Sequence, residues 1–165
     1  MARIFMLKGD INRPGHVDIP EESTTLREVV EQLGGGMVNG KRCKAVQIGG
    51  PSGGCIPASL IDTPIDYDNL IAIGSMMGSG GLIVMDEDTC MVDIAKFFLE
   101  FTVDESCGKC TPCRVGTRRL LEMLEQITAG NGTVELLREM EELCYYIKAN
   151  SLCALGQSAP NPVLS

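Results

Sequence analysis

The residues with the clearest capacity for chemistry are the cysteines. The sequence holds eight of them, at positions 43, 55, 90, 107, 110, 113, 144 and 153. Three thiols recur at intervals of three residues in Cys107-Gly-Lys-Cys110-Thr-Pro-Cys113, and the last cysteine of the chain is Cys153. Cysteines so close in sequence do not readily pair with one another, but a looped backbone can direct all three thiolates at one centre. The spacing therefore favours a metal site.

The arrangement of these thiols discriminates among the groups that they could bind. Structural zinc sites with four cysteines usually take two ligands from each of two short loops, whereas here three come from one segment. The run C-x₂-C-x₂-C holds three irons of a cubane iron–sulfur cluster, and the fourth ligand then comes from elsewhere in the chain. One [4Fe–4S] cluster is the favoured interpretation, with zinc and disulfides as the alternatives.

Two cysteines compete to be the fourth ligand. Cys144 falls in a predicted helix over residues 134–148, whose apolar positions 136, 137, 140, 143, 144 and 147 share one face. It is therefore expected to be a small core residue. Cys153 follows this helix in a turn-like segment that can present a thiolate. The predicted ligands are Cys107, Cys110, Cys113 and Cys153.

Basic residues surround the motif. A [4Fe–4S]²⁺ centre with four thiolates has a net charge of about −2, so nearby cations and N–H donors favour its reduced form. Lys109 and Arg114 flank the ligands, whereas Arg118 and Arg119 are as readily explained as a solvated helix face. Pro112 fixes φ and removes a donor between two ligands, which stiffens the loop. The isolated cysteines at 43, 55 and 90 are expected to be buried.

The elements that must position these thiols are predicted to be helical. Residues 86–165 contain only five of the 19 glycines, and glycine penalises helix interiors. Apolar periodicity predicts helices over residues 91–103, 114–127 and 134–148, the first of them capped by Asp88 and Thr89. We expect these helices to form a small bundle around the cluster.

The glycine-rich first half is predicted to be a small β-grasp-like domain. Strands are expected at Arg3–Lys8, His16–Ile19, Lys44–Ile48 and Gly81–Asp86. Thr25-Leu-Arg-Glu28 has capping-box spacing, and Leu26, Val29, Val30 and Leu33 follow at helical intervals. The predicted fold class is therefore α+β. It comprises a β-grasp-like domain at residues 1–85 and an all-α, cluster-binding domain at residues 86–165.

Composition argues against several classes of function. The formal charge of 14 − 22 = −8 and the lack of Trp speak against a nucleic-acid surface. No apolar run approaches the roughly 18 residues that span a bilayer, so we expect no membrane insertion and a cytoplasmic location. The loop Gly49–Gly54 lacks the Lys-Ser/Thr pair of a P-loop and is expected to be a structural turn without a nucleotide.

The motif residues resemble a known family. Glu105–Arg114 (ESCGKCTPCR) and Ser151–Gly156 (SLCALG) resemble the NADH-binding flavoprotein subunit of respiratory complex I. They are more similar to the corresponding subunit of NAD(P)-linked, electron-bifurcating [FeFe] hydrogenases and formate dehydrogenases, and Gly49–Pro57 and Gln157–Pro162 are similar to the hydrogenase branch. The resemblance implies a β-grasp domain of the soluble-ligand-binding type, followed by a 4Fe–4S domain with ligands Cys107, Cys110, Cys113 and Cys153.

The resemblance also implies the role of this chain within a longer subunit. In that family a domain carrying FMN and the NAD(P) site precedes the β-grasp domain, and none of it is expected in these 165 residues. The implied function is an electron relay from FMN through the cluster to other subunits of a hydrogenase or NADH dehydrogenase complex. This chain alone is then expected to be inactive toward NAD(P)H. The alternative is a metal-stapled interaction module, with zinc or without metal.

Overall fold

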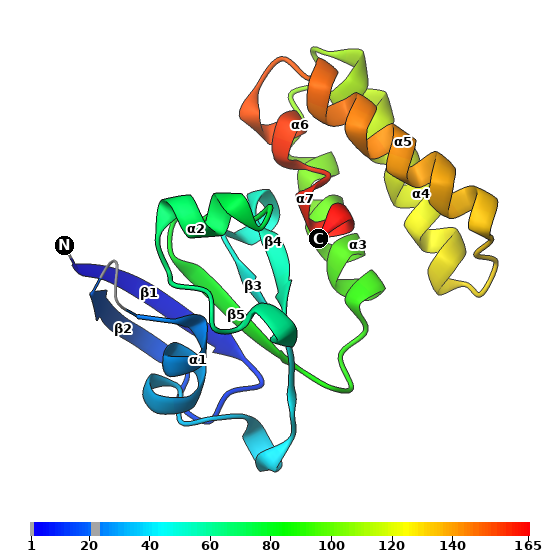
Figure 1. Ribbon diagram of the computed structural model, residues 1–165. Coiled ribbons are helices and arrows are strands. Elements are labelled where there is room, and N and C mark those ends of the chain that lie inside the picture. Colours follow the sequence, from blue (N-terminus) through cyan, green and yellow to red (C-terminus); the bar gives the residue numbers. More distant parts are fainter. Residues whose placement is uncertain (1, 21–23) are drawn as a thin grey trace. The chain divides into compact units, whose positions relative to one another are not determined.

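The computed structural model describes residues 2–20 and 24–165, and it confirms the α+β class (Figure 1). The chain divides into two compact units, one running to Thr89 and including Ser165, the other comprising Cys90–Leu164. The boundary expected from the sequence, between residues 85 and 86, lies four residues before this one (89 − 85 = 4).

The first unit is built on a five-stranded sheet in the order β2-β1-β5-β3-β4. Its strands are β1 (Ala2–Gly9), β2 (Gly15–Pro20), β3 (Cys43–Ile48), β4 (Gly54–Pro57) and β5 (Gly81–Asp86). Strand β1 pairs in parallel with β5 and antiparallel with β2, whereas β3 lies antiparallel to both β5 and β4. A hairpin at each edge and a parallel central pair give the sheet arrangement expected of a β-grasp domain.

Short helical segments pack against this sheet. They are α1 (Leu26–Glu28), the π-helical η1 (Val29–Leu33), α2 (Tyr67–Ala72) and the 3₁₀ turns η2 (Val38–Gly40), η3 (Gly50–Ser52) and η4 (Ala58–Leu60). The predicted capping box is confirmed, because the Thr25 hydroxyl accepts from the Glu28 N–H and the Glu28 carboxylate accepts from the Thr25 N–H.

The apolar face predicted for the helical residues 26–33 is confirmed at its first three positions and wrong at the fourth. Leu26, Val29 and Val30 are buried in one core with residues of the sheet such as Phe5. Leu33, which was expected on the same face, is 39% exposed. The segment changes from α-helix to π-helix at Val29, and the wider π turn changes the phase at which later side chains meet the core.

The second unit is helical. Its elements are α3 (Met91–Asp104), the π-helical η5 (Pro112–Gly116), α4 (Thr117–Thr128), α5 (Val134–Asn150), α6 (Ala154–Ser158) and α7 (Asn161–Leu164). Figure 1 shows α4 and α5 lying side by side as an antiparallel pair. Their shared core includes Leu120, Leu124, Met140, Cys144 and Ile147.

Three helix predictions need correction. Leu137 was expected on the buried face of α5 but is 49% exposed. Asp88 and Thr89 do not cap α3, whose N-cap is Cys90. The Thr89 hydroxyl donates instead to the Asp86 carboxylate at the end of β5, at 3.1 Å. The helix predicted from residue 114 begins as η5 and becomes α-helical only at Thr117.

No helix within residues 2–20 and 24–165 is both long enough and apolar enough to cross a membrane.

Candidate iron–sulfur site

The loop after α3 carries three of the four predicted ligands. Gly108 has a φ of +74°, a left-handed conformation that glycine adopts without strain, and the chain turns there between Cys107 and Cys110. Arg114 Nη1 donates to the Gly108 carbonyl at 2.9 Å and so fastens the turn to the segment that follows the motif. Cys107 is exposed, Cys110 is half-buried and Cys113 is buried.

The fourth predicted ligand lies in the connection between α5 and α6. Ser151 is the C-cap of α5 and Cys153 is the N-cap of α6, and both have an extended backbone. The backbone N–H of Leu152 donates to the Cys110 thiol and is the largest cause of its lowered pKa, followed by the backbone N–H of Cys113. The segment that carries Cys153 therefore contacts the loop that carries Cys110.

Two glycines allow these segments to approach closely. A Cβ built on Gly156 would lie 2.5 Å from Ser151 Oγ and 3.0 Å from Cys113 Cβ. A Cβ on Gly116 would lie 2.7 Å from Cγ1 of Ile147 in α5. Since side chains do not tolerate such contacts without movement, glycine at both positions is required for η5 to pack against the end of α5 and the start of α6.

Of the four proposed ligands, the thiols of Cys110 and Cys113 interact with each other. In the part of the chain that the structure describes, no three Cys, His, Asp or Glu side chains are grouped so as to hold a metal ion. Cys107 and Cys153 are both exposed. The donor set fits a cluster in its chemistry, because two backbone N–H groups already favour the thiolate of Cys110.

The remaining cysteines differ in their environments. Cys144 has no exposed surface and belongs to the helical core, where burial raises the pKa of its thiol to about 12. Burial also raises the pKa of Cys55, to about 11. Cys43 is half-buried, and the expectation of burial is wrong for Cys90, which is exposed because it stands at the N-cap of α3 rather than on its apolar face.

Basic side chains follow the motif along η5 and α4. Arg114, Arg118 and Arg119 border a groove of about 500 Å³, together with Val115 and Glu122. Arg119 pairs with Glu122 at 3.0 Å, and both side chains are half-exposed. Arg118 and Arg119 therefore form a solvated helix face, whereas Arg114 is tied to the ligand loop through Gly108.

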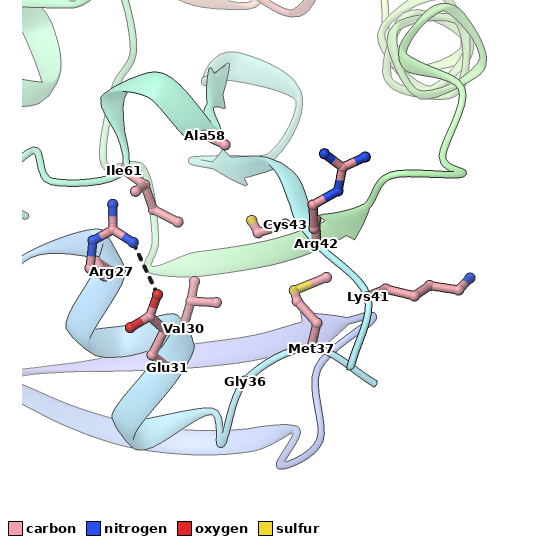
Figure 2. Close-up of a pocket in the computed structure, with 10 residues that line it drawn as sticks. All are labelled: Arg27, Val30, Glu31, Gly36, Met37, Lys41, Arg42, Cys43, Ala58 and Ile61. Carbon is pink, nitrogen blue, oxygen red and sulfur yellow. Dashed lines mark hydrogen bonds and ion pairs between the residues drawn. The ribbon is translucent and has the colours of Figure 1, made fainter. Parts of the chain in front are cut away.

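The first unit has a cleft of about 480 Å³, which Figure 2 shows with its lining residues. Three of these residues are cationic, and each is already paired with carboxylates: Arg27 with Asp62 and Glu31, Lys41 with Asp86 and Asp88, and Arg42 with Glu87. The dashed line in Figure 2 marks the pair between Arg27 and Glu31. Because these positive charges are neutralised, the cleft is poorly suited to a phosphate group.

The glycine loop between β3 and β4 directs several of its N–H groups inward. Gly49 donates to the Gly81 carbonyl at 3.2 Å, and Gly53 donates to the Gly50 carbonyl at 3.1 Å. Gly54 donates to the Ser75 hydroxyl at 3.2 Å. N–H groups committed in this way do not form an anion-binding concavity, which supports the interpretation of the loop as a structural turn.

A β-grasp unit joined to a helical unit with a C-x₂-C-x₂-C loop defines a class of iron–sulfur protein. Residues 93–165 match the family model of the NADH-ubiquinone oxidoreductase-F iron-sulfur binding region, and residues 4–56 match that of the SLBB domain. Each of the two units thus matches its own family model, and the resemblance seen in the motifs is confirmed.

Relatives of this chain come from two kinds of enzyme complex. It is 53% identical over 164 residues to the NADP-reducing hydrogenase subunit HndC of Solidesulfovibrio fructosivorans, a match that covers 99% of this chain and 33% of that one. It is 43% identical over 157 residues to the F 2 subunit of the NADH-quinone oxidoreductase of Rhizobium meliloti, covering 95% and 37% respectively. The chain therefore spans about a third of the length of these curated relatives.

A solved structure shares the fold. The crystal structure of an NAD⁺-reducing [NiFe]-hydrogenase in the H₂-reduced state matches with a TM-score of 0.86 and 32% sequence identity. The match covers 99% of this chain and 27% of that chain.

Proposed function

We propose that this chain is the electron-relay segment of an NAD(P)H-linked oxidoreductase subunit. In this role it takes single electrons from FMN through one [4Fe–4S] cluster and passes them to a partner subunit of a hydrogenase or NADH dehydrogenase complex. The observation that carries the proposal is the close approach of the two cysteine segments at Gly156, where a Cβ would lie 2.5 Å from Ser151 Oγ and 3.0 Å from Cys113 Cβ. The names of the relatives support this class of complex.

The chain's own residues have distinct roles in this proposal. Cys107, Cys110, Cys113 and Cys153 would hold the cluster, which supplies one-electron chemistry when bound. The backbone N–H groups at Leu152 and Cys113 favour a thiolate at Cys110. Lys109 and Arg114 place positive charge next to the ligands, which favours the reduced state. The bond from Arg114 to Gly108 holds the turn between the first two ligands.

In this proposal, FMN and NAD(P) bind to a domain that precedes the β-grasp unit in the longer subunit. That domain passes electrons directly to the cluster of this chain. The 165-residue chain alone is then inactive, and NADH-dependent dye reduction by the purified chain would contradict this. The eight free cysteines suit a reducing compartment, which supports a cytoplasmic location.

Anaerobic reconstitution with iron and sulfide tests the proposal. The wild-type chain is expected to bind about four irons and four acid-labile sulfides and to give an electron paramagnetic resonance (EPR) signal after reduction. Binding of zinc without sulfide would favour the metal-stapled interaction module instead.

Cysteine variants assign the ligands. Cys107→Ser, Cys110→Ser, Cys113→Ser and Cys153→Ser are each expected to lose the visible absorbance of the cluster. Cys144→Ser is the matched control, since Cys144 lies in the helical core, and it is expected to retain the cluster. Loss in Cys144→Ser with retention in Cys153→Ser would reverse the assignment of the fourth ligand.

A further inference from the structure

Within residues 2–20 and 24–165, one buried hydroxyl of the second unit has no hydrogen-bond partner. Ser151 is 5% exposed, and its Oγ is buried without a hydrogen bond in the part of the chain that the structure describes. Burying a hydroxyl that makes no hydrogen bond is unfavourable, so native proteins rarely retain one without a reason. The position of Ser151 suggests what that reason is.

Ser151 lies against the proposed ligands. A Cβ built on Gly156 would be 2.5 Å from Ser151 Oγ and 3.0 Å from Cys113 Cβ, so both side chains border the same small space. The next residue, Leu152, donates its backbone N–H to the Cys110 thiol. The unpartnered Ser151 hydroxyl thus borders the side chain of the proposed ligand Cys113, and the residue after Ser151 contacts the proposed ligand Cys110.

A second hydroxyl contacts a proposed ligand directly. Ser106 Oγ lies 3.3 Å from Cys113 Sγ. The same oxygen accepts the backbone N–H of Gly108 at 3.3 Å, which leaves the hydroxyl proton available for donation. A cysteine that ligates a metal has lost its proton, so only Ser106 can then be the donor in this pair.

We propose that Ser106 and Ser151 donate hydrogen bonds to sulfur at the cluster site and thereby raise its reduction potential. Ser106 donates to Cys113 Sγ, and Ser151 donates to a sulfur of the bound cluster; the inference rests on the proposed function. Reduction adds one electron and increases the negative charge on the sulfurs, so a donor stabilises the reduced form more than the oxidised form. Both serines are positioning residues that tune the ligands.

The midpoint potential of the reconstituted 165-residue chain tests this inference, measured by EPR-monitored redox titration. Ser106→Ala and Ser151→Ala are each expected to lower it. The expected size is up to about a tenfold rise in the ratio of oxidised to reduced cluster at a fixed potential, which is a shift of about 59 mV for one electron. Ser106→Thr and Ser151→Thr retain the hydroxyl and are expected to stay near the wild-type potential.

Ser158→Ala is the matched control. Ser158 is also buried, at 7% exposure, but its hydroxyl already donates to the Ala154 carbonyl at 2.7 Å. Its removal is expected to leave the potential unchanged. A shift in Ser158→Ala equal to those of the other two variants would show that general packing sets the potential, and this would overturn the inference.

Two further results separate the inference from the proposed function. A loaded cluster with an unchanged potential in both alanine variants overturns the role of the serines and leaves the relay standing. A wild-type chain that binds no iron and sulfide overturns both. If an alanine variant does not bind the cluster, the valine and threonine variants at the same position are compared instead, because these two side chains have similar volume and only threonine has a hydroxyl. Equal midpoint potentials in the valine and threonine variants overturn the inference.

Discussion

The two units differ in whether the polar groups of their candidate sites have partners within the fold. In the first unit, the cations of the cleft are paired with carboxylates, as in the bridge from Lys41 to Asp86 and Asp88. In the second, the Ser151 hydroxyl is buried without a described partner, and the thiols of Cys107 and Cys153 are exposed. Unsatisfied groups concentrate where a protein performs its function. The contrast supports the proposal that the second unit, rather than the first, binds the cluster.

Alanine at two glycines is expected to damage the two units separately. Gly9 has a φ of +93°, and a Cβ there would collide with the Val84 carbonyl oxygen. Gly9→Ala should therefore destabilise the first unit by more than about 2 kcal/mol, measured by urea unfolding.

Gly156→Ala should abolish cluster loading, measured as sulfide content, because its Cβ would collide with Ser151 and Cys113.

Gly132→Ala is the control for both substitutions, since a Cβ there meets nothing closer than 3.5 Å. It is expected to preserve both the urea midpoint and the sulfide content. Cluster loss in Gly132→Ala, or full loading in Gly156→Ala, would contradict the importance of the close approach at Gly156.

Alkylation of the thiols sharpens the comparison without mutation. In the cluster-free chain, the exposed Cys107 and Cys153 should react with iodoacetamide, and cluster loading should protect both. Cys90 is exposed but is not a proposed ligand, so it should react in both states. Mass spectrometry of the labelled peptides measures these differences. Protection of Cys90 together with the ligands would mean that something other than ligation shields the thiols.

Cys144 provides the other limit of the same experiment. Burial raises the pKa of its thiol from 9.0 to about 12, so the reactive thiolate is on the order of 1,000-fold rarer than for an ordinary thiol near neutral pH. Cys144 should therefore remain unlabelled in the folded chain and react only after denaturation. Rapid labelling under native conditions would show that the helical core opens readily.

A smaller effect is expected from acid on the first unit. Lys41, the Thr89 hydroxyl and the Asp88 N–H hold the pKa of Asp86 below its usual value near 3.9. A lowered folded-state pKa stabilises the fold fully above the usual value, and that stabilisation is lost as the pH falls through the lower one. The urea midpoint of the first unit should therefore decrease below about pH 4.

Asp86→Asn should lower the midpoint at neutral pH and flatten this acid dependence. Glu125→Gln removes an exposed carboxylate from α4 in the other unit and should leave the dependence intact. An unchanged acid profile in Asp86→Asn would assign the effect to other carboxylates.

The smallest expected effect is the absence of nucleotide binding. The cations of the cleft are paired, and Gly49, Gly53 and Gly54 use their N–H groups within the fold. Calorimetric titration of the chain with NAD, NADP or FMN should give no saturable heat. Micromolar binding that maps to Gly49–Gly54 would make the loop part of a cofactor site and remove the contrast between the units.

Local patterns in the sequence predicted most of the elements. Strand β5 matches its expected range of Gly81–Asp86, and the capping box at Thr25 fixes where α1 begins. The short elements were missed: β4 has four residues and α2 has six, too few for an alternation or a helical period to be visible. Neither sequence pattern nor propensity marked η5 as a π-helix, and the close packing of Gly116 against Ile147 in α5 is a tertiary contact that no local pattern reveals.

The site was predictable only in part. The spacing of the thiols identified Cys107, Cys110 and Cys113 as a group, since that spacing is local. No sequence pattern assigned a role to Ser106 or Ser151. The contact of Ser106 with Cys113 depends on how the ligand loop turns, and the approach of Ser151 to Cys113 depends on the return of the chain at Gly156. Serines beside cysteines are common, and only the absence of a partner for a buried hydroxyl distinguishes Ser151.

The π-helical segment η5 has a consequence for insertions and deletions. Cys113 lies within η5, and α4 continues from it with Leu120, Met123 and Leu124 buried in the core. Each residue of an α-helix turns the chain by about 100°, so deleting one residue from the segment 114–116 would rotate Cys113 by about that angle relative to the buried face of α4. Chain length is therefore fixed between this cysteine and Leu120, whereas the exposed turn at 129–133 can change length without moving a thiol.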